Sequence, residues 1–197
     1  ASYVKELVLY NDLPNIINQL KDGNLAGINI TQPHKSNMLK YVDEVNIRAK
    51  TIGAINVIVK KNKKLIGNNT DWFGFSKSLE INNINLQNKD IIVLGSGGVA
   101  KSICFVLEKC GVSSINLFNR TLENAELLQS NKIKPYLLED LDKYVDNNSI
   151  IINCTSVGLS IDQSPMSSDL LSKNQIIIDT IYSPLRTKLL IDAKQMG

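Results

Sequence analysis

The stretch DIIVLGSGGVAKSI, residues 90–103, decides the fold of the second half of this chain. DIIVLG is a short continuous apolar run, which is typical of a parallel strand covered on both faces. The residues that follow fit the pattern G-x-G-x-x-A between a strand and a helix, where the glycines allow a tight turn and a close approach of backbone to a pyrophosphate. Unpaired amides at the start of the helix then face the anion, which predicts a dinucleotide site. The predicted cofactor contacts in this loop are Gly95, Ser96, Gly97, Gly98, Val99 and Ala100.

Similar apolar runs recur further along the chain, with helix-like segments between them. They are SINLFN at 114–119, SIIINCT at 149–155 and QIIIDT at 175–180. Strands that alternate with helices indicate a parallel sheet with right-handed crossovers. The second half is therefore predicted to be a doubly wound, parallel Rossmann-type α/β domain.

The residues after the second of these strands indicate which dinucleotide binds. An NAD site usually carries an acid there, which bonds the ribose hydroxyls. This chain has Asn119, Arg120 and Thr121 instead. A guanidinium can hold a 2′-phosphate through charge-assisted hydrogen bonds, whereas an acid would repel it. The residues favour NADP(H), and the structural alternative is a surface arginine at a strand end.

The first half also alternates strand and helix signals. Residues 3–10 read as a strand, and a helix is expected between Pro14 and Gly23, which suit its first turn and its end. The remaining expected elements are a strand at 27–31, a helix beginning near residue 33, a second helix at about 43–51, strands at 54–61 and 64–69 joined by a lysine-rich turn, and a helix at 73–82.

The polar stretch at 82–90 is the best candidate for a domain boundary. We expect a substrate-binding and catalytic domain at 1–84, built on a smaller, mainly parallel α/β sheet, and an NADP-binding Rossmann domain at 85–197.

Composition excludes several classes of function. The net charge of +3 is small, and the 6% of aromatic residues do not alternate with basic ones, so no nucleic-acid partner is expected. No apolar run approaches the roughly 18 residues that span a bilayer, so no membrane partner is expected either. Cys104, Cys110 and Cys154 show no C-x-x-C pairing, which favours free thiols in a reducing cytoplasm and predicts no metal site.

Three polar residues of the first half stand out by position. Lys35 follows Pro33 by two residues, in the first turn of the helix expected there, where a cation opposes the helix dipole. Asp71 precedes a helix, where an acid is most often an N-cap. Asn56 interrupts an apolar segment, and a buried amide needs hydrogen-bond partners. Each has a structural alternative to a functional role.

Taken together, these segments resemble the shikimate dehydrogenase family. Seven of its motifs occur here in order and span essentially the whole chain. They are G-x-N-x-T-x-P-x-K at 27–35, G-A-x-N at 53–56, G-x-N-T-D-x-x-G at 67–74, the glycine loop at 95–100, N-R-T at 119–121, N-x-T-x-x-G at 153–158 and D-x-x-Y-x-P-x-x-T at 179–187.

The resemblance implies NADPH-dependent reduction of 3-dehydroshikimate to shikimate, and the reverse oxidation, in aromatic amino-acid (chorismate) biosynthesis. It implies that Lys35 and Asp71 are the catalytic pair, with Lys35 acting either as the proton donor and acceptor or through its charge while a water relays protons. The implied substrate contacts are Thr31, Asn56, Asp71 and Tyr182, and the implied contacts at the nicotinamide end are Thr155, Ser156 and Val157.

Some features depart from the family pattern. Its N-terminal serine pair and a C-terminal glutamine belong before residue 1 and after residue 197, so we expect an N-terminal strand and a C-terminal segment to be missing. Asn124 stands where the family often has a second basic residue, which leaves some use of NAD open.

Three alternative functions follow from the same residues. The first is an enzyme that accepts quinate, alone or together with shikimate. Glutamyl-tRNA reductase has a similar glycine loop but needs a cysteine in its first domain, and none precedes Cys104. A non-catalytic dinucleotide-binding regulator would have lost Lys35 or Asp71, and both are present. We expect a small-molecule substrate and a monomer or homodimer.

Overall fold

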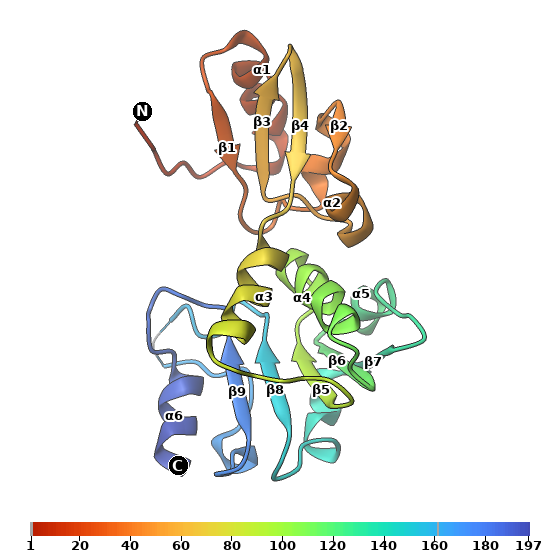
Figure 1. Ribbon diagram of the computed structural model, residues 1–197. Coiled ribbons are helices and arrows are strands. Elements are labelled where there is room, and N and C mark those ends of the chain that lie inside the picture. Colours follow the sequence, from red (N-terminus) through yellow and green to blue (C-terminus); the bar gives the residue numbers. More distant parts are fainter. Residues whose placement is uncertain (1, 161) are drawn as a thin grey trace. The chain divides into compact units, whose positions relative to one another are not determined.

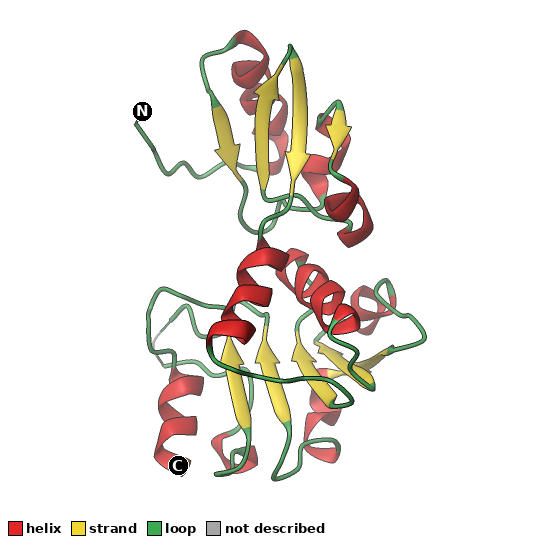
Figure 2. Ribbon diagram, viewed as in Figure 1, coloured by secondary structure: helices red, strands yellow, loops and turns green. Residues whose placement is uncertain are grey.

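The computed structural model describes residues 2–160 and 162–197, which divide into two compact units between Asp71 and Trp72 (Figure 1). The first unit contains a four-stranded sheet and the second a five-stranded sheet, each with its own helices (Figure 2). This confirms the predicted fold class, which is two α/β domains. Within the described residues, no helix is both long and apolar enough to cross a bilayer.

The first unit is a sheet of order β1-β3-β4-β2 with its helices packed against it. Its main helix begins with proline at its second residue and ends at Gly23, whose φ of 85° only glycine adopts readily. Its buried apolar residues, including Leu20, Met38 and Ile58, form one core. The elements are η1 (Tyr10–Asp12), α1 (Leu13–Asp22), β1 (Gly27–Asn29), η2 (Asn37–Tyr41), β2 (Glu44–Val45), α2 (Ile47–Ile52), β3 (Val57–Lys61) and β4 (Lys64–Asn68).

This smaller sheet is mixed, which corrects the expectation of a mainly parallel one. β3 runs antiparallel to both β1 and β4, and only β2 and β4 are parallel. For β3 and β4 the reason lies in the lysine-rich turn, where Asn62 and Lys63 have φ values of 51° and 64°. Such a two-residue turn closes a hairpin, and a hairpin makes its two strands antiparallel.

The strand expected at residues 3–10 is not formed. A strand-like composition is not sufficient for a strand, because the backbone also needs a neighbouring strand to pair with. This segment is instead bonded to other parts of the unit, in part through the side chains of Asn29 and His34. The Tyr3 hydroxyl accepts from Asn29 Nδ2 at 3.4 Å, and the Val8 carbonyl lies 2.9 Å from His34 Nε2.

Two helices expected in the first unit begin later than predicted, and the first of them is a 3₁₀ helix. Residues 32–36 form turns that lead into η2. The Lys35 carbonyl accepts the N–H of Ile55 at 2.9 Å, so it does not accept the N–H of Leu39 as it would in an α-helix. The helix expected at 43–51 is a short strand, β2, followed by α2, which begins after Asn46. The Asn46 side chain accepts from Arg48 N at 3.0 Å and caps that helix.

The second unit is an all-parallel sheet of order β7-β6-β5-β8-β9, as the apolar runs predicted. One strand, β7, was not expected. It contains Pro135, which an edge strand tolerates. The elements are α3 (Asp71–Ile81), β5 (Asp90–Leu94), α4 (Gly98–Lys109), β6 (Ser114–Asn119), α5 (Leu122–Glu126), β7 (Ile133–Leu137), η3 (Leu138–Lys143), β8 (Ile150–Asn153), η4 (Ser168–Leu170), β9 (Ile176–Asp179) and α6 (Lys188–Met196).

Both faces of this sheet are covered, which explains why its strands read as continuous apolar runs. Ile91 and Val93 of β5 belong to the core that α3 and α4 cover, while Ile92 and Leu94 belong to the core that α6 covers. The loops that follow β5, β6, β8 and β9 all leave the carboxyl edge of the sheet. This is the edge at which open parallel sheets bind their ligands.

Candidate functional site

The first unit brings Lys35 and Asp71 into direct contact, although they lie 36 residues apart in the sequence. Lys35 Nζ donates to Asp71 Oδ2 at 2.7 Å. Lys35 is only 8% exposed, and the Asp71 side chain is 24% exposed. Because solvent reaches this pair poorly, the charge-assisted bond holds the ammonium in one place.

Asn56 completes the contacts of this carboxylate. Its Nδ2 donates to Asp71 Oδ1 at 2.8 Å and to Thr70 Oγ1 at 3.0 Å, and its Oδ1 accepts the backbone N–H of Thr70 at 2.9 Å. A backbone N–H can only donate, so this last bond fixes which end of the amide carries oxygen. Asn56 therefore presents its NH2 group to the carboxylate.

Two residues that the sequence analysis did not single out support this arrangement. Thr70 orients Asn56, as described above, and Asn69 supports the start of α3. Asn69 Oδ1 accepts from Asp71 N at 3.0 Å, and its Nδ2 donates to the Ala54 carbonyl at 3.0 Å. Both residues lie inside the G-x-N-T-D-x-x-G motif, so the motif indicated that they matter. Their hydrogen-bond partners could not be predicted, because those bonds form only in the folded chain.

The backbone under the site comes from the ends of three strands. The N–H of Ile30 donates to the Asn56 carbonyl at 2.7 Å, and the N–H of Asn56 donates to the Asn68 carbonyl at 2.9 Å. Thr31 follows β1 but is exposed, and its hydroxyl lies 3.5 Å from the Gln32 carbonyl. Of the predicted residues, Lys35, Asn56 and Asp71 thus form one network, and Thr31 lies outside it.

The network can stabilise negative charge on an oxygen and supply a proton to it. An ammonium has three N–H donors, and in the described residues one donates to Asp71, which leaves two for a ligand. A fixed cation beside a carbonyl carbon that gains a hydride stabilises the developing alkoxide. The same group can then act as the acid.

The glycine loop of the second unit has the geometry of a phosphate-binding turn. Gly95 has a φ of 94°, and a Cβ there would lie 3.0 Å from Thr155 Cγ2, so only glycine fits. Its N–H donates to the Phe118 carbonyl at 2.7 Å, which ties the loop to β6. A Cβ on Gly97 would meet no heavy atom within 4 Å. Backbone at the start of α4 therefore faces open space, which suits a pyrophosphate.

Residues 119–121, at the ribose end of the expected site, include no acid. Asn119 ends β6 and donates to the Thr121 carbonyl at 2.8 Å, while Arg120 is exposed. Asn124 is exposed on α5. An accessible guanidinium without a neighbouring carboxylate at 119–121 fits a 2′-phosphate.

The loop expected at the nicotinamide end is held by its own polar groups. Asn153 Oδ1 accepts from Thr155 N at 3.0 Å and from Thr155 Oγ1 at 2.8 Å, and Val157 N donates to Thr155 Oγ1 at 3.0 Å. Ser156 is exposed between them. Tyr182 lies in the loop after β9 and is 80% exposed.

The three cysteines differ in burial, and burial affects the pKa of their thiols. Burial raises the pKa of the Cys104 thiol to about 12 and raises that of Cys154 well above its ordinary value. All three are free thiols, and Cys110 is the most accessible of them.

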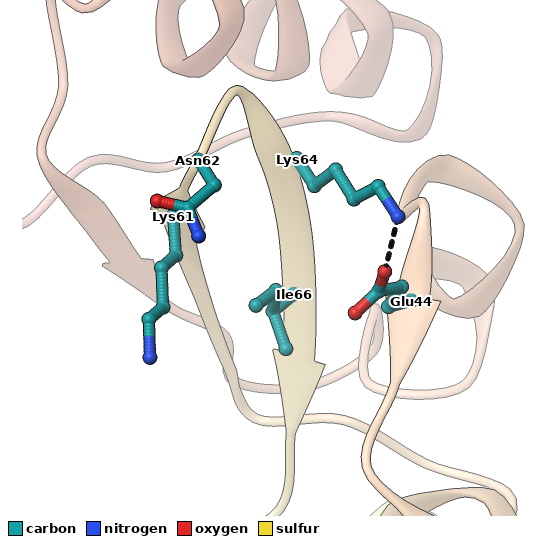
Figure 3. Close-up of a pocket in the computed structure, with 5 residues that line it drawn as sticks. All are labelled: Glu44, Lys61, Asn62, Lys64 and Ile66. Atoms are coloured by element: carbon teal, nitrogen blue, oxygen red, sulfur yellow. Dashed lines mark hydrogen bonds and ion pairs between the residues drawn. The ribbon is translucent and has the colours of Figure 1, made fainter.

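A hollow lies at the opposite end of β3 and β4, around the lysine-rich turn (Figure 3). The interaction marked in the figure is the ion pair of Lys64 Nζ with Glu44 Oε1, at 2.5 Å. Both side chains are at least half exposed, and such pairs contribute about 0–1 kcal/mol. We therefore interpret this hollow as part of a solvent-exposed hairpin turn and not as a binding site. It is lined by Glu44, Lys61, Asn62, Lys64 and Ile66.

Comparisons with known proteins agree with one another. The family described as Shikimate dehydrogenase substrate binding domain matches residues 1–58, and the family described as Shikimate / quinate 5-dehydrogenase matches residues 77–184. Over its whole length the chain is 38% identical to a shikimate dehydrogenase (NADP(+)) of Bacillus cereus strain AH187, and it covers 74% of that relative.

Solved structures give the same result. A shikimate dehydrogenase from Aquifex aeolicus is similar with a TM-score of 0.82 and 35% identity, over 96% of this chain and 70% of that one. The shikimate 5-dehydrogenase from Thermus thermophilus, solved in complex with NADP(H) and shikimate, has a TM-score of 0.80 and 30% identity, over 96% of this chain and 71% of that one.

Proposed function

This chain belongs to the shikimate dehydrogenase family, and we propose that Lys35 and Asp71 are the residues that carry its chemistry. The activity is the NADP-dependent reduction of 3-dehydroshikimate to shikimate and the reverse oxidation, a step of aromatic amino-acid biosynthesis. The observation that carries the assignment of residues is the 2.7 Å contact between the two side chains in a poorly solvated position.

In this proposal Lys35 binds the substrate oxygen that changes between ketone and alcohol. NADPH, when bound, supplies the hydride. The two remaining N–H groups of Lys35 donate to the oxygen as it gains negative charge, and one of them delivers the proton. In the oxidation the same nitrogen, directly or through a water, receives that proton.

Asp71 holds the ammonium and sets its direction. Because its Oδ1 is already engaged by Asn56, the carboxylate cannot rotate without breaking a bond of 2.8 Å or one of 2.7 Å. Asn56, Thr31 and Tyr182 are proposed to bind the ring hydroxyls, and Asn56 also contacts Asp71.

The proposed cofactor contacts follow the open backbone of the second unit. Residues 95–100 bind the pyrophosphate, and the loop with Thr155, Ser156 and Val157 binds the nicotinamide end. Asn119, Arg120 and Thr121 hold the adenosine ribose and its 2′-phosphate. These residues fit NADP(H) because Gly97 leaves room for the phosphates and no acid opposes the 2′-phosphate.

The two units are proposed to have separate tasks. The substrate is assigned to the domain expected at residues 1–84, with Tyr182 as a further contact, and NADP(H) to the domain expected at residues 85–197. We further propose that the chain works in the cytoplasm, since its three cysteines are free thiols, as a monomer or homodimer and without a nucleic-acid partner.

Shikimate oxidation by the purified chain tests the assignment. NADPH formation is followed with NADP+ and shikimate, with quinate as the competing alcohol, and NAD as the competing cofactor. We expect turnover with shikimate and NADP+, and a large loss of kcat in Lys35→Ala. Nearly full kcat for Lys35→Ala at saturating shikimate would contradict the role of Lys35, and equal kcat/KM for both cofactors would contradict the role of Arg120.

A further inference from the structure

The carboxylate of Asp179 joins two loops at the carboxyl edge of the second sheet. Asp179 is the last residue of β9. Its Oδ1 accepts from Asn153 Nδ2 at 3.1 Å and from the backbone N–H of Ile181 at 2.9 Å. Its Oδ2 accepts from Thr187 Oγ1 at 2.7 Å. One side chain therefore connects three points that are separated in the sequence.

The first of these partners organises the loop at 153–158. Asn153 is fully buried, and besides Asp179 its Nδ2 donates to the Val157 carbonyl at 3.1 Å. Its Oδ1 receives both bonds from Thr155 described above. A shift of Asn153 would thus move both ends of the loop that we assign to the nicotinamide.

The other two partners are the ends of the loop that carries Tyr182. Ile181 lies at its start, and Thr187 lies at its end, where it is fully buried. Thr187 Oγ1 also accepts the Leu190 N–H at 3.4 Å and so caps α6. Tyr182 projects from this loop and is largely exposed, so its position depends on these two anchors.

Packing brings the two loops into direct contact. Gly158 has a φ of 114°, and a Cβ there would lie 3.2 Å from Ile181 Cδ1 and 3.5 Å from Thr187 Cβ. The glycine loop is joined to the same assembly, because Gly95 packs against Thr155. Movement of the loop at 153–158 is therefore expected to shift both the glycine loop and the loop at 180–187.

We propose that Asp179 is a positioning residue that couples the cofactor loop at 153–158 to the Tyr182 loop at 180–187. The inference rests on the proposed function. When NADP(H) orders the first loop, the three bonds of the carboxylate restrain the second loop, and Tyr182 becomes fixed for the substrate. Its role is therefore distinct from that of a carboxylate that only stabilises the fold.

Hydrogen–deuterium exchange on the purified full chain, with and without NADP+, tests this coupling without relying on turnover. In the wild type, we expect NADP+ to slow exchange at both 153–158 and 180–187, by about tenfold at the second loop. In Asp179→Ala the protection at 180–187 falls to less than about twofold, whereas that at 153–158 persists at saturating NADP+.

Two conservative variants and a control sharpen the result. Asp179→Asn keeps an oxygen for Asn153 and Ile181, and its amide can donate to Thr187, so it should retain the coupling. Thr187→Val removes the 2.7 Å bond to Asp179, together with the cap of α6, and should weaken the coupling while the bonds of Asp179 to Asn153 and Ile181 remain. It provides a second test if Asp179→Ala does not fold. Asp169→Ala removes an aspartate that bonds to Ser167 within its own turn, and it should leave the exchange pattern unchanged.

The outcomes separate the inference from the proposed function. Equal NADP+ protection of 180–187 in wild type and Asp179→Ala, or none in the wild type, would overturn the coupling. A lower melting temperature with unchanged protection would mean that Asp179 is only structural, and would also overturn it. If NADP+ protects no segment of the wild type and shikimate is not oxidised, the proposed function fails and the coupling fails with it.

Discussion

Asp71→Asn is the substitution that most directly tests the reacting pair. It preserves the shape of the side chain but replaces one acceptor oxygen by a donor. Thr70 N fixes the orientation of Asn56, which therefore always presents its NH2 to residue 71. An amide at 71 can accept from Lys35 or from Asn56, but in either orientation its NH2 group faces the other donor. One of the two bonds is necessarily lost.

The size of the effect follows from the bond that is lost. A hydrogen bond to a charged group contributes about 1.5–3 kcal/mol. Each 1.36 kcal/mol in the activation barrier is a factor of ten in rate. If the Lys35 ammonium loses its fixed position in the transition state, kcat/KM for shikimate should therefore fall about 10-fold to about 150-fold.

Steady-state oxidation of shikimate with saturating NADP+ measures this loss. An NADP+ titration serves as a control, because the affinity for NADP+ should be the same in wild type and Asp71→Asn. Glu44→Gln is the matched control, because it breaks another carboxylate–lysine pair of the first unit. That pair is largely exposed, so kcat/KM should change by less than about twofold. In a double variant with Lys35→Met, the two effects should not add, because both remove the same interaction. A value for Asp71→Asn within about threefold of wild type would refute the reasoning.

Four further predictions concern the second unit. Arg120→Ala should raise the KM for NADPH about 10-fold to about 100-fold and leave that for NADH nearly unchanged, since only NADPH offers a charged partner; equal effects on both cofactors would show that Arg120 does not read the 2′-phosphate. Gly95→Ala places a Cβ 3.0 Å from Thr155 Cγ2 at a φ of 94°, so we expect a loss of about 1–2 kcal/mol in stability and weaker NADPH binding by fluorescence titration. Gly74→Ala, on α3 with no neighbour within 4 Å, is the control and should be neutral or stabilising. Alkylation of the native chain at about pH 8 should modify Cys110 first, because burial raises the pKa of Cys104 to about 12 and keeps it protonated. Since the unfolded thiol ionises near pH 9 and the folded one does not, the free energy of unfolding should fall as the pH rises above 9, which denaturant titrations at about pH 8 and about pH 10 would detect.

The second sheet could be predicted from the sequence because its signal is local. Strands covered on both faces read as apolar runs, and the glycine loop has a pattern that backbone geometry dictates. The strand β7 was missed because Pro135 and Lys134 interrupt its pattern, and an edge strand needs only one partner. How β7 pairs with β6 depends on contacts between the two strands, which the sequence of residues 133–137 alone does not specify.

The first unit was predicted less well because its local signals compete with long-range bonds. Residues 3–10 have a strand-like composition, yet they form no strand in the described part of the chain. Lys35 and Asp71 were identified through a resemblance and not through any periodicity. Asn69 and Thr70 were missed as supporting residues because their role is to hold Asp71 and Asn56, and that role exists only after the chain has folded.

The failure of the expected helix at Pro33 is itself the reason that the site can form. In an α-helix, the Lys35 carbonyl would accept the N–H of Leu39, four residues later. Here Leu39 N donates to the Ser36 carbonyl at 3.4 Å, and the Lys35 carbonyl is free to accept from Ile55 at 2.9 Å. That bond fixes the backbone of Lys35 beside the segment that ends in Asn56, whose amide also binds Asp71. A sequence change that restored helix at 33–39 would break this bond and withdraw the ammonium from its carboxylate, so a poorly helical segment is a requirement of the site.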